Sequence, residues 1–545
     1  MDRAATCSCM LCHQNNIQRN TGLASPEDLD QAFNTWLGLQ HHALPYSRYR
    51  VAGLLDNLIE SWLVGQWFTL PGTGSLWRII YMQSIEYSGL FWLPSNPDNR
   101  VAGSLSFTDE DGITLQLIGS FGELDTFEST KAHPLVLGLS TNGKKITLTH
   151  CIAMSKKVSM PGFYIEGYRG NFCFVGGHFQ EPNELRFRRL AVRYSHLPDW
   201  VRMSGFSVTR KSEEHKVEIV YELPQEVKAE TSKGIISLSF SGQMTGDGIE
   251  RMNIEQSVWL EVEIVEEVEL QTLFRQYVSA LQNFLTLATT KPNSIIELQV
   301  FSPLVYMERQ NDERIEIPIQ VLFRQKYLKE LPHELLMPDY MLFVLEDVFD
   351  DFEVIMDNWL NMAQELDSVC NRFFGVQYTT RMNLQNEFLN IVQALESYHR
   401  QRMKNEVQPR VEYKRRIEAI LSRVDTQDRH WLREILAYGN EPRLEQRLNE
   451  LLEKVHAVVS PVIDDTAIFA KKVKNTRHYL THLDKSKKRK AARGAELYWL
   501  TRKLSYVLQA CLLLELGLSL DKSAALLHRN QSFILTPSLE DEGKR

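Results

Sequence analysis

The chain has 545 residues and a net charge of −8, from 61 Lys and Arg against 69 Asp and Glu. This length exceeds what one hydrophobic core normally supports, so we expect about two to four domains. An acidic protein repels nucleic acid on average, so any contact with nucleic acid must come from a local basic patch.

The N-terminal segment, residues 1–60, is expected to be an arm that holds a cysteine-rich stretch and one helix, Pro26–Leu39. Four soft metal ligands fall within seven residues near its start, which suggests a structural zinc site. They are Cys7, Cys9, Cys12 and His13. The spacing is tighter than in ordinary zinc modules, so the alternative is a flexible arm with free thiols.

Neither a secretory signal nor a membrane span is expected. The segment Met1–Cys7 lacks an apolar region. The most apolar segment, Tyr506–Leu520, is too short to span a bilayer and contains Gln509 and Glu515, so we expect a buried helix there. Cysteines scattered along the rest of the chain fit a reducing cytoplasm better than a disulfide framework.

Residues 61–330 are predicted to form a β-rich, sandwich-like domain, because short apolar runs alternate with Gly, Asn, Asp and Pro. One helix is expected within it, over Leu270–Ala288, and Thr141–Lys144 has the Asn-Gly centre of a hairpin turn. The predicted strands are Gly103–Phe107, Ile113–Ile118, Pro134–Leu139, Lys145–Thr149, Phe172–Val175, Lys216–Tyr221, Ile235–Phe240, Ser257–Val265, Ile295–Phe301 and Gln320–Phe323.

From about Leu345 onward the apolar spacing becomes helical. We expect a helical connector over residues 331–380, an all-α bundle over 381–530 and a polar tail over 531–545. The fold class is therefore α+β multidomain. The predicted helices are Phe349–Phe373, Asn383–Met403, Tyr413–Leu421, Arg443–Val459, Asp464–Leu483 and Arg493–Leu518.

A basic helical segment near the C-terminus carries the strongest chemical signal. Arg477 and His482 are five positions apart, and His478 lies between them. A guanidinium group clamps phosphate, an imidazole moves protons near neutral pH, and lysines hold a polyanion. The cationic run that follows comprises Lys485, Lys487, Lys488, Arg489 and Lys490. Together these residues suggest a site that cuts RNA.

The Arg-x4-His spacing alone does not establish a catalytic site. His accounts for 15 of 545 residues, so a given Arg has about a 3% chance of a His at that offset. Arg210 and His215 also match, in a stretch between strands that we expect to be a solvated loop. The alternative at Arg477 is likewise a solvated helix face followed by a soluble loop.

Helix geometry constrains how such a site is built. His478 and His482 share one helix face, whereas Arg477 lies about 140° around a straight helix from His482. The site then needs a facing copy of the chain, or a helix that loosens near Thr481 and His482.

Two parts of the chain resemble the ApeA family of bacterial anti-phage defence proteins. The helical part resembles its HEPN domain, a small bundle with an Arg-x4-6-His motif and a polar residue after the Arg, often Asn, where this chain has His478. Phe388–Arg400 is similar to the first helix of that domain. The β-rich part resembles the ApeA N-terminal domain at Tyr87–Pro94, Gly103–Phe107, Gly112–Leu115, Gly119–Phe121, Gly138, Gly143–Leu148, Gly177–Phe179 and Val192–Trp200.

This resemblance implies an endoribonuclease of abortive infection that uses no metal for catalysis. Arg477 is expected to bind the scissile phosphate, and His482 to transfer a proton or position the phosphate. His478 is expected to donate a proton or orient the site, while the cationic run holds flanking phosphates. It implies a cytoplasmic bacterial protein that acts as a homodimer or higher homo-oligomer on tRNA or other cellular RNA, without a membrane partner. A phage-derived trigger would act through the β-rich domain.

A rival interpretation assigns the same domains but no catalytic activity. Some HEPN domains are thought to bind RNA or nucleotides, or to dock a partner, without cutting. The chain would then be a non-catalytic protein with a β-domain sensor.

Overall fold

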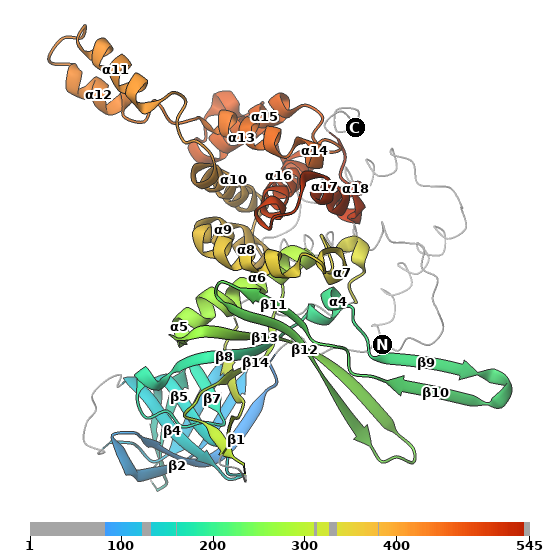
Figure 1. Cartoon of the computed structure of the whole chain (residues 1–545). Coiled ribbons are helices and arrows are strands. Elements are labelled where there is room, and N and C mark those ends of the chain that lie inside the picture. The colour runs from blue at the N-terminus through green and yellow to red at the C-terminus, as the bar shows by residue number, and fades with distance from the viewer. Residues whose placement is uncertain are drawn as a thin grey trace, which may run out of the picture. The chain divides into compact units, whose positions relative to one another are not determined.

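The structure is a computed structural model, and it describes residues 82–122, 132–159, 161–309, 313–325, 335–379 and 381–538. These residues fall within one compact unit, 77–545. Strands fill its first part and helices its second (Figure 1). This order confirms the α+β class, with a β-rich region before an all-α one.

Six strands close into an antiparallel barrel in the order β5-β4-β1-β2-β3-β6, because β6 also pairs with β5. The expected sandwich-like arrangement is therefore a closed barrel in this part. A register shift between Ala153 and Ser155 lets β5 bend, so that β7 pairs with its first part and β6 with its last part. The strands are β1 (Ile85–Leu93), β2 (Asn96–Thr108), β3 (Gly112–Ile118), β4 (Ala132–Ser140), β5 (Lys145–Val158) and β6 (Tyr164–Gly170). Closure leaves these strands without free edges.

The same sheet continues from β5 through seven more strands in the order β7-β17-β14-β8-β13-β12-β11. They are β7 (Phe172–Val175), β8 (Arg186–Tyr194), β11 (Val227–Thr231), β12 (Gly234–Gly246), β13 (Met252–Glu269), β14 (Ile295–Phe301) and β17 (Ile319–Phe323). Two separate ribbons are β9 (Phe206–Lys211) with β10 (Lys216–Tyr221), and β15 (Tyr306–Glu308) with β16 (Arg314–Glu316). Each of the ten predicted strands lies within one of these strands.

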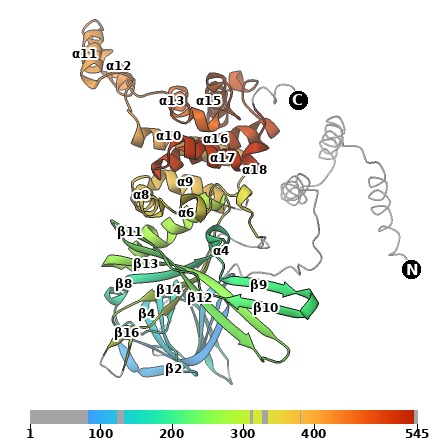
Figure 2. The same ribbon diagram turned by 45° about the vertical axis from the view of Figure 1, so that its right-hand side comes forward.

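The stretch that repeats the Arg-x4-His spacing is not simply a loop. Arg210 is exposed on strand β9, and a 3-10 turn, η2 (Ser212–Glu214), leads to His215, which is exposed at a φ of +49°. The ribbon projects beside the extended ends of β12 and β13 (Figure 2). This Arg-x4-His match lies on an exposed ribbon, whereas Arg477 and His482 lie on an α-helix with one face buried in the bundle.

The helix expected over Leu270–Ala288 contains a π-helical turn. It is built from α5 (Leu270–Leu273), the turn η3 (Phe274–Val278) and α6 (Ser279–Thr289). Two short 3-10 turns, η1 (Pro182–Glu184) and η4 (Pro338–Tyr340), and helix α4 (Leu197–Val201) complete the β-rich part. Helix α6 is buried on most sides, because it packs between the sheet and the helices that follow.

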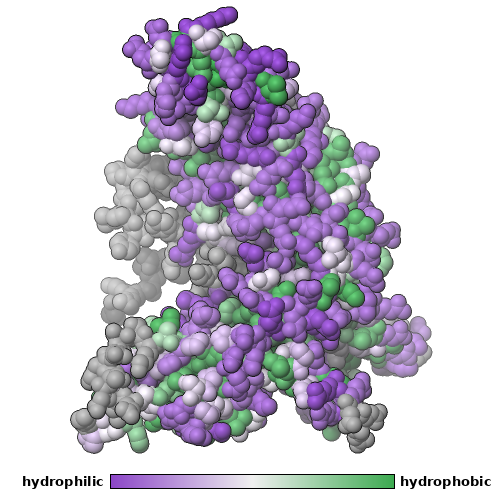
Figure 3. All heavy atoms as spheres, turned by 60° about the vertical axis from the view of Figure 1, so that its left-hand side comes forward, coloured by the Kyte–Doolittle hydropathy of each residue, from purple (hydrophilic) through white to green (hydrophobic). Residues whose placement is uncertain are grey.

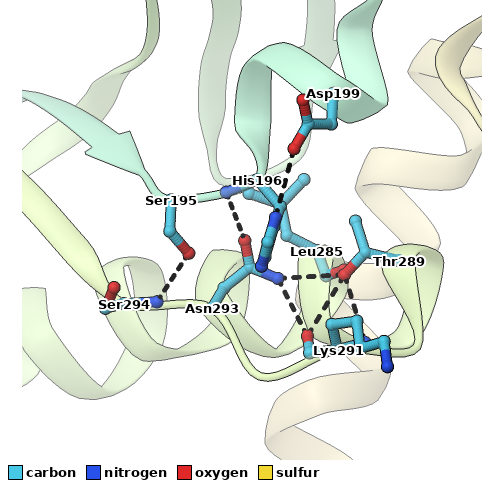
Figure 4. Close-up of polar contacts among 8 residues, drawn as sticks. All are labelled: Ser195, His196, Asp199, Leu285, Thr289, Lys291, Asn293 and Ser294. Atoms are coloured by element: carbon cyan, nitrogen blue, oxygen red, sulfur yellow. Dashed lines mark hydrogen bonds and ion pairs between the residues drawn. The ribbon is translucent and has the colours of Figure 1, made fainter. Parts of the chain in front are cut away.

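A buried polar network holds α4, α6 and β14 together (Figure 4). Asn293, fully buried, donates to Thr289 Oγ1 at 3.0 Å and to the Lys291 carbonyl at 3.1 Å, and accepts from the His196 N–H at 3.1 Å. His196 Nδ1 in turn lies 3.2 Å from Asp199 Oδ2. These hydrogen bonds pair polar groups that would otherwise be buried without partners, so the cluster stabilises the packing of α4 against the end of α6 and the start of β14.

The second part of the chain is helical, which confirms the expected bundle. Its helices are α7 (Leu345–Val348), α8 (Phe352–Glu365), α9 (Asp367–Tyr378), α10 (Leu384–Arg402), α11 (Arg410–Leu421), α12 (Arg429–Leu436), α13 (Leu444–Lys454), α14 (His456–Val459), α15 (Thr466–His482), α16 (Gly494–Glu515), α17 (Leu520–Arg529) and α18 (Gln531–Ile534), with the 3-10 turn η5 (Lys485–Lys487).

Several predicted helix boundaries were wrong. The expected helix Phe349–Phe373 is broken at Leu366, and Arg443–Val459 is broken at Val455; both side chains are fully buried. Helix α18 lies in the expected polar tail. Helix α16, by contrast, buries most of its length, as expected for the apolar segment after Tyr506. Among the described residues, none of the helices combines the length and apolarity needed to cross a membrane.

Helices α11 and α12 form an arm between α10 and α13 (Figures 1 and 2). Leu421 is the only residue in these two helices that is buried. Trp431, Ile435 and Tyr438 lie at helical spacing with 61%, 54% and 77% of their surface exposed. In the space-filling view the arm, at the top, shows hydrophobic residues among hydrophilic ones (Figure 3).

Candidate functional site

Helix α15 carries Arg477, His478 and His482. Asp465 caps its start by accepting a hydrogen bond from the Ile468 N–H at 2.8 Å. One face is buried in the bundle through Phe469, Ala470, Val473, Asn475 and Thr476. The helix ends after His482 because Leu483 turns into the left-handed region, at a φ of +53°, and bonds back to the Tyr479 carbonyl. The helix stays regular up to His482, so loosening near Thr481 and His482 is not how the site is built.

The two histidines come together as their spacing predicts. Their ring centroids are 4.9 Å apart, with an angle of 51° between the planes. His482 is exposed, and the His478 side chain is 44% exposed. His478 Nε2 also lies 3.3 Å from Asp484 Oδ2, just beyond the end of the helix. A pair of solvent-accessible imidazoles is thus present at one end of α15.

Arg477 points to another neighbour. Its Nη2 lies 3.9 Å from Glu396 Oε2 on α10, and the Arg477 side chain is 34% exposed. Among the described residues no hydrogen bond, ion pair or ring contact joins Arg477 to His482. One protomer therefore places the guanidinium and the imidazole pair on neighbouring flanks of one helix, as the helix geometry predicts.

The cationic run forms a structured turn after α15. Lys485, Lys488, Arg489 and Lys490 are exposed and Lys487 is half-buried. Within the described part of the chain, none of these five side chains forms an ion pair. Residues 471–493 contain ten Lys and Arg and one Asp, a net charge of +9 (10 − 1), in a chain of net charge −8. This is the local basic patch that an acidic protein needs to bind a polyanion.

Two residues fasten the far end of this turn to the helix. Thr476, fully buried, accepts from the Ala492 N–H at 2.9 Å and donates to the Lys472 carbonyl at 2.9 Å. Arg493 stacks over the Tyr479 ring at 5.2 Å and donates to the Lys488 carbonyl at 3.1 Å. The turn therefore leaves and rejoins α15 at fixed points, with its lysines facing solvent.

Sequence reasoning missed the residues that support the site. Four residues contact or support the predicted side chains, although no role was predicted for them. They are Glu396, Thr476, Asp484 and Arg493. Asp484 had a detectable signal, because an Asp directly after a helix end commonly caps the next turn. Glu396 and Thr476 gave none, because their partners are distant in sequence.

The cysteine cluster Cys7, Cys9, Cys12 and His13 lies outside the described residues, so its zinc site stays a prediction. Within the residues that the structure describes, no group of three or more His, Cys, Asp and Glu side chains is arranged to hold a metal ion.

The family model for the ApeA N-terminal domain 1 matches residues 86–359, half of the chain, from β1 into α8. The chain belongs to the ApeA family. A second model, Apea-like HEPN, matches residues 389–522 and contains α15, the basic turn and the arm. No curated protein and no solved structure gave a match.

The match puts the imidazole pair inside the HEPN domain and the barrel inside the ApeA N-terminal domain. This ApeA protein is therefore a HEPN-family protein of anti-phage defence. Its Arg477, His478 and His482 lie within the segment that the HEPN model matches.

Proposed function

We propose that this ApeA protein is an endoribonuclease that cuts RNA without a metal ion, by attack of the ribose 2′-OH on the adjacent phosphorus. The observation that carries the proposal is the surface made by α15 and the turn after it. Arg477 and the paired rings of His478 and His482 lie beside five cations that form no ion pair with the described residues. Each group matches a separate requirement of phosphodiester cleavage.

In the proposed step the O2′–P bond forms as the P–O5′ bond breaks, which leaves a 2′,3′-cyclic phosphate and a 5′-OH. One proton leaves the 2′-OH and one is delivered to O5′. His482 and His478 supply these transfers, since an imidazole suits proton transfer near neutral pH. Arg477 stabilises the charge that builds on the non-bridging oxygens, which a fixed guanidinium fork does well.

The basic turn would hold the flanking phosphates, and this gives affinity without sequence choice. tRNA and other cellular RNAs are the substrates that fit such a surface. The active form would be a homodimer, or a higher homo-oligomer, in which facing HEPN domains gather Arg477 and the histidines. The separation of Arg477 from His482 on one helix supports this arrangement. The protein would act in the bacterial cytoplasm, and the β-rich domain would restrain the nuclease until a phage-derived trigger arrives.

The test is cleavage of mixed cellular RNA by the purified full chain in the presence of a chelator. We expect the wild type to cut and His482→Ala to be at least about 100-fold slower. His215→Ala is the matched control, because it removes the histidine of the second Arg-x4-His match, and it should cut like the wild type. Equal cleavage by His482→Ala would exclude His482 from the mechanism. RNA binding without cleavage by the wild type would favour the non-catalytic alternative.

A further inference from the structure

We propose that Asp484 is a positioning residue that orients His478 and fixes it to the basic turn. The proposal rests on the proposed function, since it assigns a role within the same site. No general feature of the motif predicts it, because the carboxylate follows the helix and lies outside the Arg-x4-His spacing.

The two carboxylate oxygens of Asp484 make two different contacts. Oδ1 accepts from the Ser486 N–H at 2.9 Å and so caps the 3-10 turn of the basic run. Oδ2 lies 3.3 Å from His478 Nε2. The left-handed Leu483 allows this by turning the chain sharply at the helix end. One side chain thus couples the turn that presents the lysines to the ring that lies against His482.

Other carboxylates near the helix are already engaged. Glu396 faces Arg477 at 3.9 Å, and Glu445 on α13 pairs with Lys474 at 2.5 Å. Among the described residues, Asp484 is the carboxylate that pairs with His478. Hydrogen bonds from Ser486, with a smaller effect of His478, keep the pKa of Asp484 below its usual value, so it is ionised at neutral pH.

An ionised carboxylate beside one ring nitrogen fixes the tautomer of an imidazole. Asp484 Oδ2 covers Nε2 of His478 and favours the ring orientation in which that nitrogen faces the carboxylate. It also restricts rotation of a ring that is otherwise partly exposed. His482 has no such partner among the described residues, so the two histidines are not equivalent.

The first experiment compares Asp484→Asn with the wild type in RNA cleavage by the full chain. Asn keeps an oxygen that accepts from the Ser486 N–H, so the turn is preserved while the charge is removed. We expect kcat to fall about 10-fold or more with KM nearly unchanged, and Asp484→Glu to restore part of kcat. Asp521→Asn removes an exposed carboxylate on α17 and serves as the control with unchanged kcat. A rise in KM alone, or a full kcat in Asp484→Asn, would overturn the positioning role.

The second experiment needs no nuclease activity. Diethyl pyrocarbonate acylates accessible imidazole nitrogens, and mass spectrometry gives the rate at each His. Asp484→Asn should speed acylation of His478 several-fold relative to His215, which is exposed on the distant ribbon. An unchanged ratio would refute the pairing even if the protein cuts RNA. If the wild type cuts no RNA, the proposed function fails, and this ratio still decides the pairing.

Discussion

At the scale of single residues, the surface formed by α15 and the basic turn depends on buried side chains that hold it in place. Thr476 is the clearest case, because its hydroxyl satisfies a buried backbone N–H from Ala492, sixteen residues away. Arg477 and His478, the next two residues of the helix, are partly exposed. A buried hydroxyl thus fixes where the basic turn rejoins the bundle.

Replacing Thr476 by Val keeps the shape of the side chain and removes its hydrogen bonds. The Ala492 N–H is then left buried without a partner, and we expect a loss of about 1–3 kcal/mol in the free energy of unfolding. RNA affinity should also fall, because the lysine turn is less firmly held. Thr481→Val, an exposed change on the same helix, is the control. Chemical denaturation measures the first effect, and equal stability of the two variants would contradict it.

At the scale of elements, α10 and α13 support α15 through a buried polar contact of their own. His399, fully buried on α10, lies 2.6 Å from Glu450 Oε2, and Arg447 Nη1 lies 3.0 Å from His399 Nδ1. Burial lowers the pKa of His399, with Arg447 acting in the same direction and Glu450 against it. His399 is therefore held neutral, with Arg447 as a donor to its Nδ1.

This network makes stability depend on pH. The pKa of His399 is lower in the folded chain than in the unfolded one, so the unfolded chain binds more protons as the pH falls below about 6.5. The contribution of neutral His399 is present above that pH and is lost as the pH falls through the folded pKa. We expect the melting temperature of the wild type to fall more steeply between about pH 7 and pH 5 than that of His399→Gln. Parallel curves would show that His399 does not titrate in this way.

The arm of α11 and α12 contributes little to the bundle. Asn440 closes its base by accepting from the Val407 and Gln408 N–H groups and donating to the Gln408 carbonyl. Leu421 is the only side chain that the two helices bury. Replacing residues 410–437 by a short Gly-Ser linker should therefore change the free energy of unfolding of the bundle by no more than about 0.5 kcal/mol. Calorimetry of the wild-type chain and of the chain with the linker checks this. A large loss of stability would mean that the arm packs against another part of the protein.

Periodicity recovered most of the long helices and ten strands, but it missed several shorter elements. Helix α12 was not predicted, because only eight residues form it and its apolar positions are too few to set a clear helical period. The barrel was predicted as sandwich-like because closure depends on the pairing of β5 with β6, which strand patterns do not encode. The breaks at Leu366 and Val455 were missed for a similar reason, since a buried Leu or Val fits helical periodicity on both sides of a break.

At the candidate site, the chemical groups could be predicted from the sequence, whereas their contact partners are known only from the tertiary structure. Arg477, His478, His482 and the lysine run were visible as residue types at a known spacing. Glu396 and the Thr476–Ala492 bond were not, because they join segments separated by a turn or by whole helices.

At the scale of the molecule, specific polar contacts join the last helices of the segment matched by the ApeA N-terminal model to its strands and to helices near the C-terminus. Arg529 on α17 makes two hydrogen bonds to Asp347 on α7, at 2.7 and 2.5 Å. Asn358 on α8 donates to the Leu516 carbonyl at 3.1 Å, and Asp357 accepts from the backbone and side chain of Ser232, beside β11. Under the proposed function, these bonds would carry a change in the β-rich domain to the HEPN domain.

The central claim is that Arg477 and the imidazoles of α15 break the RNA backbone. The most direct measurement is the chemistry of the RNA ends produced by the purified full chain in chelator, compared with Arg477→Ala and Arg210→Ala. We predict 2′,3′-cyclic phosphate and 5′-OH ends from the wild type and Arg210→Ala, and about 100-fold to 1,000-fold less product from Arg477→Ala. Products with 5′-phosphate ends, or equal cleavage by Arg477→Ala, would contradict the account.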